Sequence, residues 1–304
     1  MPPTSPRAAR AAPDDAATDD GEDLAGRLAR LRDAGLTDIR PTGGRGGVRH
    51  FRARDAAGRE LFVKAAATAP AAAELTAEGL GLAWLAEARA VPIPDIVYSE
   101  NGSLALLALA PGQPDRGSAE RFGRDLAATH SAGAERFGSA WPGWIAGLPL
   151  PDAGAMTWPE WYAQARLAPF ARRARDAGDL DAADLTVLEA VAGRIGDLAG
   201  PEEPPSRIHG DCWSGNVLWS GGSAWLIDPA AHGGHRETDL AMLALFGAPH
   251  LDRILAAYRE VAPLADGWQA RAPLHQLHPL LVHVCLFGRS YREAVLSAAR
   301  AVLS

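Results

Sequence analysis

The apolar residues of this chain follow one pattern before residue 110 and a different pattern after residue 115. Within residues 36–65, the short segments Val48–Arg54 and Glu60–Lys64 follow a glycine-rich turn at 43–47 and a second turn at 56–58, which predicts two or three antiparallel strands. Beyond residue 115, most apolar residues recur at helical spacing. Strands gathered at one end and helices at the other are typical of an α+β protein.

Helix signals frame the strands of the first part. We expect one helix over residues 23–34 and a second from Pro70 to the residues before Pro92. The apolar segment 104–110 indicates a buried strand that leads into a linker. The sequence therefore divides into a disordered tail (residues 1–22), a small N-terminal lobe (residues 23–110) and a larger helical C-terminal lobe (residues 111–304).

The helical part is interrupted once. A helix with Ser118 as its N-cap and Gly133 as its stop is expected first, and others near Trp158 and over residues 180–198. The chain returns to helix from Thr238 to its end. In between, the helical pattern breaks, and we expect short strands at residues 207–208, 217–219 and 224–227.

The charge balance narrows the classes of partner. The 304 residues include 30 Lys and Arg against 37 Asp and Glu, a net charge of −7, which argues against a nucleic acid as the main partner. The longest apolar run, residues 104–110, is far shorter than the roughly 20 residues that cross a bilayer. Two widely spaced cysteines and a first segment without a signal-peptide core predict a cytoplasmic protein.

Polar residues that suit phosphoryl transfer are concentrated in H-G-D-C-W-S-G-N (209–216) and L-I-D-P (226–229). Phosphoryl transfer needs a carboxylate that orients the acceptor hydroxyl and takes its proton, and oxygen ligands for Mg²⁺. Asp211, Asn216 and Asp228 supply these groups. The five-residue step from Asp211 to Asn216 equals that of the kinase loop H-x-D-x-x-x-x-N.

The first part of the chain supplies a cation for the phosphates. Lys64 is the single lysine among 30 cationic side chains, and it ends an apolar strand as the ATP-binding lysine of kinases does. Two glutamates of the next helix, Glu78 and Glu74, could pair with it. A glycine-rich turn could bring backbone N–H groups to phosphate, through Gly43, Gly44, Gly46 and Gly47.

Several segments together resemble the fructosamine kinase (ketosamine-3-kinase) family. They are H-G-D-x-W-S-G-N-V-L-W, L-I-D-P-A, G-H-R-E-T-D-L-A-M (234–242), F-V-K (62–64), W-I-A-G (144–147), R-L-A-P (166–169) and L-V-H-V-C-L-F-G (281–288). The resemblance covers residues 24–300. It implies a two-lobed protein-kinase-like fold and ATP-dependent phosphorylation of the 3-hydroxyl of ketosamine sugars, which makes these adducts decompose and frees the amine.

Carried over by this resemblance, Asp211 is the base, Asn216 and Asp228 hold Mg²⁺, and Lys64 with Glu78 positions the ATP phosphates. The same resemblance favours Glu78 over Glu74. The acceptor is a small ketosamine or a glycated lysine of a protein, and the protein is expected to be a monomer or a weak dimer, with neither nucleic acid nor membrane as a partner.

Three residues near the motif have supporting or open roles. Trp213 either offers a flat face to the sugar ring or packs in the core. Asp239, in H-R-E-T-D, and His209 are expected to hold the catalytic loop by hydrogen bonds.

Two further histidine pairs have spacings seen in metal sites, but they lack companion ligands and are interpreted as structural: His232 with His235, and His275 with His278.

Two other functions stay open at this point. A related small-molecule kinase could use the same residues on another alcohol, such as an aminoglycoside. A catalytically idle nucleotide-binding or scaffold protein is the third possibility, although all five kinase positions hold competent residue types.

Overall fold

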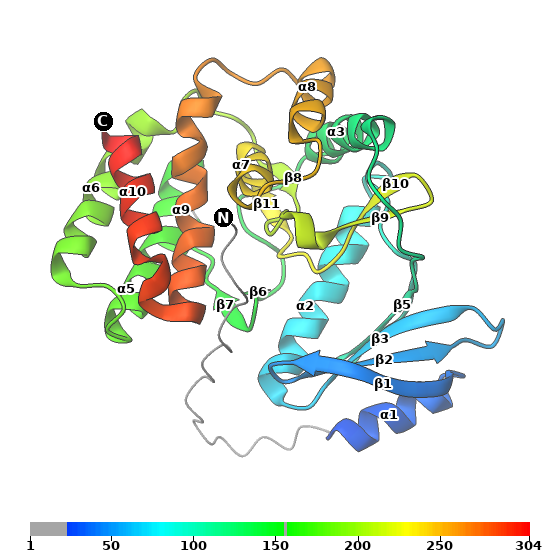
Figure 1. Cartoon of the computed structure of the whole chain (residues 1–304). Coiled ribbons are helices and arrows are strands. Elements are labelled where there is room, and N and C mark those ends of the chain that lie inside the picture. Colours follow the sequence, from blue (N-terminus) through cyan, green and yellow to red (C-terminus); the bar gives the residue numbers. More distant parts are fainter. Residues whose placement is uncertain (1–22, 155–156) are drawn as a thin grey trace.

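The computed structural model describes residues 23–154 and 157–304, so the expected tail at residues 1–22 lies outside the described residues. A five-stranded antiparallel sheet with the order β1-β2-β3-β5-β4 forms the first part (Figure 1). Its strands are β1 (Thr37–Arg45), β2 (Val48–Arg54), β3 (Glu60–Ala66), β4 (Ile96–Glu100) and β5 (Ser103–Leu107). The sheet confirms the α+β class.

Two helices accompany the sheet. Helix α1 (Leu24–Asp33) packs Leu31 into the core beside Phe51 and Val63 of the strands. Helix α2 (Ala69–Ala86) begins after Thr68, whose side chain accepts the N–H of Ala71, and Pro70 lies in its first turn, as expected. In Figure 1, α2 rises from the sheet toward the two-stranded sheet of β9 (Val217–Ser220) and β10 (Ser223–Leu226). Helix α2 also contacts strand β6 (Gly143–Ile145) of the second part.

The second part is mostly helical. It contains α3 (Arg116–Ser131), α4 (Trp158–Trp161), a π-helical turn (Tyr162–Leu167), α5 (Ala168–Asp176), α6 (Ala182–Leu198), α7 (Glu237–Phe246), α8 (Leu251–Val261), α9 (Trp268–Phe287), a 3₁₀ turn (Gly288–Tyr291) and α10 (Arg292–Leu303). Helices α5, α6, α9 and α10 lie together away from the sheet (Figure 1), around a core that includes Trp161, Leu281 and Val295. None of the helices among the described residues has the length and apolar character needed to cross a membrane.

Three short hairpins or strand pairs interrupt these helices. They are β6 (Gly143–Ile145) with β7 (Leu148–Leu150), β8 (Ser206–Ile208) with β11 (His232–Gly234), and β9 (Val217–Ser220) with β10 (Ser223–Leu226); a 3₁₀ turn, Ser214–Asn216, precedes β9. The expected strands at 207–208, 217–219 and 224–227 are confirmed. Strands β4, β6, β7 and β11 were not expected from the sequence.

One expected helix start is wrong. Asp115, and not Ser118, is the N-cap of α3. The Asp115 carboxylate accepts the N–H of Ser118, and the Ser118 hydroxyl accepts the N–H of Asp115, so Ser118 is the third residue of a reciprocal capping box. The helix therefore starts one turn earlier than expected, because the Asp115 carboxylate accepts a backbone N–H of its first turn.

Candidate active site

The predicted lysine and its partners meet where the sheet faces the second part. Lys64 lies in β3, opposite Leu104 of β5, and is 6% exposed. Its Nζ is 2.7 Å from Oε1 and 2.9 Å from Oε2 of Glu78 in α2, and 2.6 Å from Oδ1 of Asp228. Asp228 follows β10, as expected, and its side chain is 46% exposed.

The charge of Lys64 is secured by these neighbours. Burial lowers the pKa of Lys64, but Glu78 and Asp228 outweigh it and raise the pKa above its usual value. Lys64 is therefore a fixed ammonium at neutral pH. Of the two glutamates left open by the sequence, Glu78 is the one that reaches Lys64, while Glu74 accepts a hydrogen bond from the N–H of Gly147.

The loop from His209 to Asn216 brings the second pair together. The Asn216 amide donates hydrogen bonds of 2.9 Å to Oδ2 and to the carbonyl oxygen of Asp211. The loop can turn here because Gly210 has φ +80°, and a Cβ at this position would strike the carbonyl oxygen of Ala230. The turn at Gly210 and the hydrogen bonds from Asn216 therefore fix the two side chains relative to each other.

The surroundings of the Asp211 carboxyl group raise its pKa. Burial raises its pKa to about 7, Asn216 opposes this by its hydrogen bond, and the negative charge of Asp228 adds to the rise. A carboxylate with a pKa near neutrality is suited to accept a proton at physiological pH. This balance fits the base predicted at this position.

Asp239 holds the backbone of the loop at residues 209–216 by hydrogen bonds. It is fully buried, and its two oxygens accept the N–H groups of His209 (2.7 Å) and Gly210 (2.9 Å). His130 contacts the same carboxylate at 3.1 Å. Burial raises the pKa of Asp239, but these hydrogen bonds and His130 outweigh it and hold the pKa below its usual value. Asp239 is therefore a charged support of the loop backbone.

His209 joins the loop to the segment that carries Asp228. Its Nδ1 accepts the N–H of Asp211 at 3.2 Å, which leaves the ring proton on Nε2. Nε2 then donates to the carbonyl oxygen of Ile227 at 2.9 Å. Asp228 itself has φ +52°, a left-handed conformation that is strained for a non-glycine residue. Backbone strain of this kind is concentrated at functional sites.

The four glycines lie in the β1–β2 hairpin. Gly43 and Gly44 belong to strand β1, so the turn itself is shorter than predicted and is made by Gly46 and Gly47. Gly46 has φ +56°, and a Cβ on Gly47 would strike the Thr68 hydroxyl at the start of α2. The hairpin is therefore folded against the N-terminal end of α2.

Trp213 is not a core residue. It is 39% exposed, and its ring packs edge-on against Phe246 with 6.0 Å between centroids. Contacts continue from Phe246 to His283 (5.0 Å) and from His283 to Tyr291 (4.8 Å). An aromatic surface thus begins at Trp213, two positions after Asp211, and continues through Phe246 and His283 to Tyr291. Of the two alternatives for Trp213, the structure contradicts the packed core.

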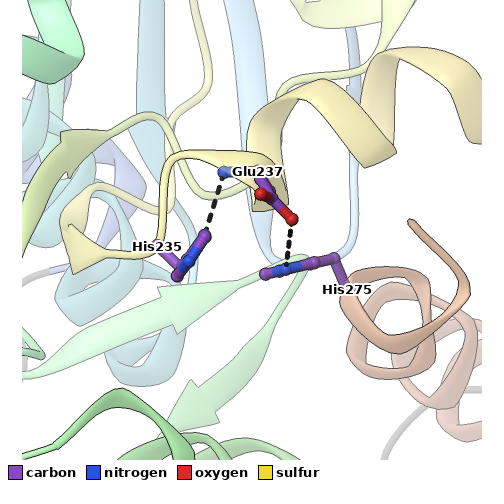
Figure 2. A group of neighbouring side chains, drawn as sticks. All are labelled: His235, Glu237 and His275. Carbon is purple, nitrogen blue, oxygen red and sulfur yellow. Dashed lines mark hydrogen bonds and ion pairs between the residues drawn. The ribbon is translucent and has the colours of Figure 1, made fainter. Parts of the chain in front are cut away.

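A third cluster was not expected from the sequence. His235, Glu237 and His275 offer ligand atoms within 4.8 Å of one another, and all three are buried (Figure 2). However, Arg271 holds both oxygens of Glu237, at 2.6 and 3.1 Å, so a guanidinium already occupies the cation position. Nδ1 of His235 accepts the N–H of Glu237 and Nδ1 of His275 contacts the Thr238 hydroxyl. This cluster fixes the start of α7, the helix that carries Asp239.

The family model described as fructosamine kinase matches residues 36–304. The chain belongs to the fructosamine kinase family. A probable ketoamine kinase of Synechocystis is 33% identical over 229 residues, 71% of this chain and 74% of that protein. A probable ketoamine kinase of Thermus thermophilus is 32% identical over 246 residues, 79% of this chain and 87% of that protein.

Solved structures agree with this membership. The crystal structure of a candidate fructosamine-3-kinase from Thermobifida fusca has a TM-score of 0.84 and 48% identity, and the alignment covers 92% of this chain and 98% of that one. An aminoglycoside phosphotransferase bound to ADP, at 13% identity and a TM-score of 0.63, shares the fold. The family member described here has the protein-kinase-like fold and is a phosphotransferase that acts on a sugar hydroxyl of ketoamines.

Proposed function

We propose that the protein transfers the γ-phosphoryl group of ATP to the 3-hydroxyl of a ketosamine sugar, with Mg²⁺, and so promotes release of the glycated amine. The observation that supports this best is the single constellation formed by Lys64, Glu78 and Asp228 beside Asp211 and Asn216. These residues match the five positions that protein kinases use for phosphoryl transfer, and they come from segments up to 164 residues apart.

The donor set suits Mg²⁺. Asn216 uses its Nδ2 for hydrogen bonds to Asp211 and to the Asp228 carbonyl oxygen, so its amide oxygen is directed elsewhere. Asp228 uses Oδ1 for Lys64. A carboxylate oxygen and an amide oxygen are hard ligands of the kind Mg²⁺ prefers. When bound, Mg²⁺ would neutralise charge on the phosphates.

Each side chain then has one task. Asp211 accepts the proton of the acceptor hydroxyl as its oxygen forms a bond to the γ-phosphorus and the bond from this phosphorus to the leaving oxygen of ADP breaks. Asn216 keeps the carboxylate in place. Lys64, oriented by Glu78, pairs with the phosphates of ATP. The β1–β2 hairpin, with Gly43, Gly44, Gly46 and Gly47, covers them with backbone N–H groups.

Trp213 is proposed to face the sugar. Its exposure beside Asp211 suits stacking against a sugar ring, and the neighbouring rings of Phe246 and His283 extend the aromatic surface. Either a small ketosamine or a glycated lysine of a protein could use this surface.

Three further expectations stay predictions. They are the lobe boundary at residue 110, the cytoplasmic location and the monomeric or weakly dimeric state.

An acceptor panel with ATP and Mg²⁺ tests the proposal. ADP release with fructosyl-lysine or ribulosyl-lysine, but not with aminoglycosides or choline, is expected, and NMR of the product should place the phosphate on the 3-oxygen. Asp211→Asn should keep the fold and remove nearly all transfer. Wild-type turnover in that variant contradicts the assigned base, and turnover with aminoglycosides alone favours the other small-molecule kinase. Thermal stabilisation by Mg-ATP without turnover favours the idle nucleotide-binding protein, and absence of both favours an idle scaffold protein.

A further inference from the structure

Helix α2 carries two glutamates one turn apart that bind different parts of the molecule. Glu78 holds Lys64 within the first part. Glu74 reaches into the second part, where its Oε1 accepts the backbone N–H of Gly147 at 2.8 Å. Gly147 lies at the tip of the β6–β7 hairpin. The same helix is therefore tied to the proposed ATP site and to a hairpin of the larger part.

The tip of this hairpin has a strained turn. Ile145 pairs with Leu148, so Ala146 and Gly147 form a two-residue turn, with φ +48° and +82°. Positive φ at both positions is typical of a type I′ turn, in which an alanine is strained at the first position. Ile145 and Leu148 are buried in the core of the helical part and hold the turn in place. The strained tip directs the Gly147 N–H to Glu74.

The other end of α2 is also held by the second part. The Arg207 guanidinium lies 4.4 Å over the Trp84 ring, donates to the Trp84 carbonyl oxygen and is 3.2 Å from Glu87. Trp84 in turn packs edge-on against Trp141, with centroids 5.9 Å apart. Arg207 lies in β8, two residues before His209. The helix is thus fixed at both ends, and each anchor is close to the proposed machinery.

We propose that the β6–β7 hairpin is a latch on α2 and that Glu74 is a positioning residue, which keeps Glu78 on Lys64 by fixing the helix that carries it. This rests on the proposed function of Lys64 and Glu78. In protein kinases the corresponding helix must be brought into position before the lysine–glutamate pair forms. Here the latch is built from the chain itself, so the pair is assembled without a regulatory partner.

The negative charge of Glu74, and not its hydrogen bond to Gly147, is a competing explanation for any loss of activity in a Glu74 variant. Lys64, Arg45 and Asp228 all act electrostatically on this carboxylate, so its removal changes the field as well as the hydrogen bond. Glu74→Gln separates the two effects, because the amide oxygen can still accept the Gly147 N–H while the charge is gone. Glu74→Ala removes both. Thr76→Ala, an exposed position on the same helix, is the matched control.

The experiment measures steady-state kinetics and hydrogen exchange on the full chain. Glu74→Ala should lower kcat/KM for ATP about tenfold, the equivalent of one hydrogen bond to a charged group, with the KM of the acceptor unchanged. The amide of Gly147 and the amides of α2 should exchange faster. Glu74→Gln and Thr76→Ala should stay within about threefold of the wild type in kcat/KM, with wild-type exchange.

A double variant decides how Glu74 acts. If it acts through Glu78, Glu74→Ala should have little further effect in a Glu78→Ala background. Wild-type kinetics and exchange in Glu74→Ala overturn the latch, and so does a Glu74→Gln variant as impaired as Glu74→Ala. Should Glu74→Ala not fold, Ala146→Gly serves instead. Relief of the strained turn should slow exchange at Gly147 or leave it unchanged, with kcat/KM for ATP at the wild-type value. Faster exchange at Gly147 with wild-type kcat/KM contradicts the proposal, because the contact with Glu74 would then not be needed. Absence of ATP-dependent transfer in the wild type refutes the proposed function, while the exchange data still report on the latch.

Discussion

Nζ of Lys64 lies 2.6 Å from Oδ1 of Asp228, although 164 residues separate the two in the sequence. The same ammonium contacts both oxygens of Glu78. The lysine ammonium is compact and has three hydrogen-bond donors, so it can contact two carboxylates at once. The Lys64 side chain does so while it is only 8% exposed. This explains why a lysine occupies this position in a chain that otherwise uses arginine.

Lys64→Arg should therefore impair the enzyme although the charge is kept. The planar guanidinium is larger and cannot meet Glu78 and Asp228 with the geometry of an ammonium. We expect ATP turnover to fall at least about a hundredfold, and overpacking to cost about 1–3 kcal/mol of unfolding free energy. Kinetics and urea denaturation measure the two effects. Arg59→Lys, at an exposed position, is the reverse control; near-normal turnover of Lys64→Arg would mean that the lysine is not required.

Asp239→Asn should separate loop support from the chemistry. Asp239 accepts two backbone N–H groups and faces His130 in a fully buried position, and an amide presents a donor where the loop also presents one. We expect a loss of about 2–4 kcal/mol in unfolding free energy, together with a fall in kcat. Urea denaturation and steady-state kinetics at a temperature where the variant is folded measure these.

The control for this variant is Asp252→Asn, whose side chain is 83% exposed. It should change neither stability nor kcat. If Asp239→Asn is as stable and as active as the wild type, the carboxylate does not hold the loop.

Local sequence signals were sufficient to place Asp211 and Asn216 in one loop. The spacing of Asp211 and Asn216 fits one tight loop, and Asp228 follows a short apolar strand, so the positions could be found without the fold. Glu78 was separated from Glu74 only by a family resemblance, because both lie on one face of α2. Their different partners depend on where the β6–β7 hairpin comes to lie, which no local pattern encodes.

The missed features involve contacts between distant segments. Strand β4 follows V-P-I-P, and the β6–β7 hairpin contains Pro149, so the usual strand signals are weak in both. The histidine pairs were weighed within each segment, by spacing. The structure instead brings His235 to His275, 40 positions away, because α7 packs on α9. Side-chain clusters of this kind become visible only once helix packing is known.

Buried histidines should make stability fall as the pH drops below 6.5. Burial lowers the pKa of His232 and of His235 from 6.5 to about 3. As the pH falls from 6.5 to 3, the unfolded chain takes up these protons and the folded chain does not, so folding is disfavoured. Each histidine should contribute a slope of about 1.4 kcal/mol per pH unit in this window. Urea denaturation at pH 7, 6 and 5 measures the slope.

His232→Asn tests this directly. An amide can replace the hydrogen bond from Nδ1 of His232 to the Ala230 carbonyl oxygen without adding a titrating group. The slope should decrease by about one proton equivalent, or about 1.4 kcal/mol per pH unit. His250→Asn, at an exposed position, should leave the slope unchanged. An identical slope in wild type and His232→Asn would rule out this histidine as a source of acid sensitivity.

Arg271→Met should destabilise the protein by leaving a buried carboxylate without its partner. Glu237 is 2% exposed, and Arg271 holds both of its oxygens. Removing one member of a buried ion pair costs about 3–5 kcal/mol, whereas neutralising both members costs less. The double variant Glu237→Gln with Arg271→Met should therefore regain part of the loss in urea denaturation. Because Glu237 opens the helix that carries Asp239, kcat should fall in the single variant and recover in the double. A double variant less stable than Arg271→Met alone contradicts this account, since it would mean that the Glu237 carboxylate stabilises the fold without Arg271.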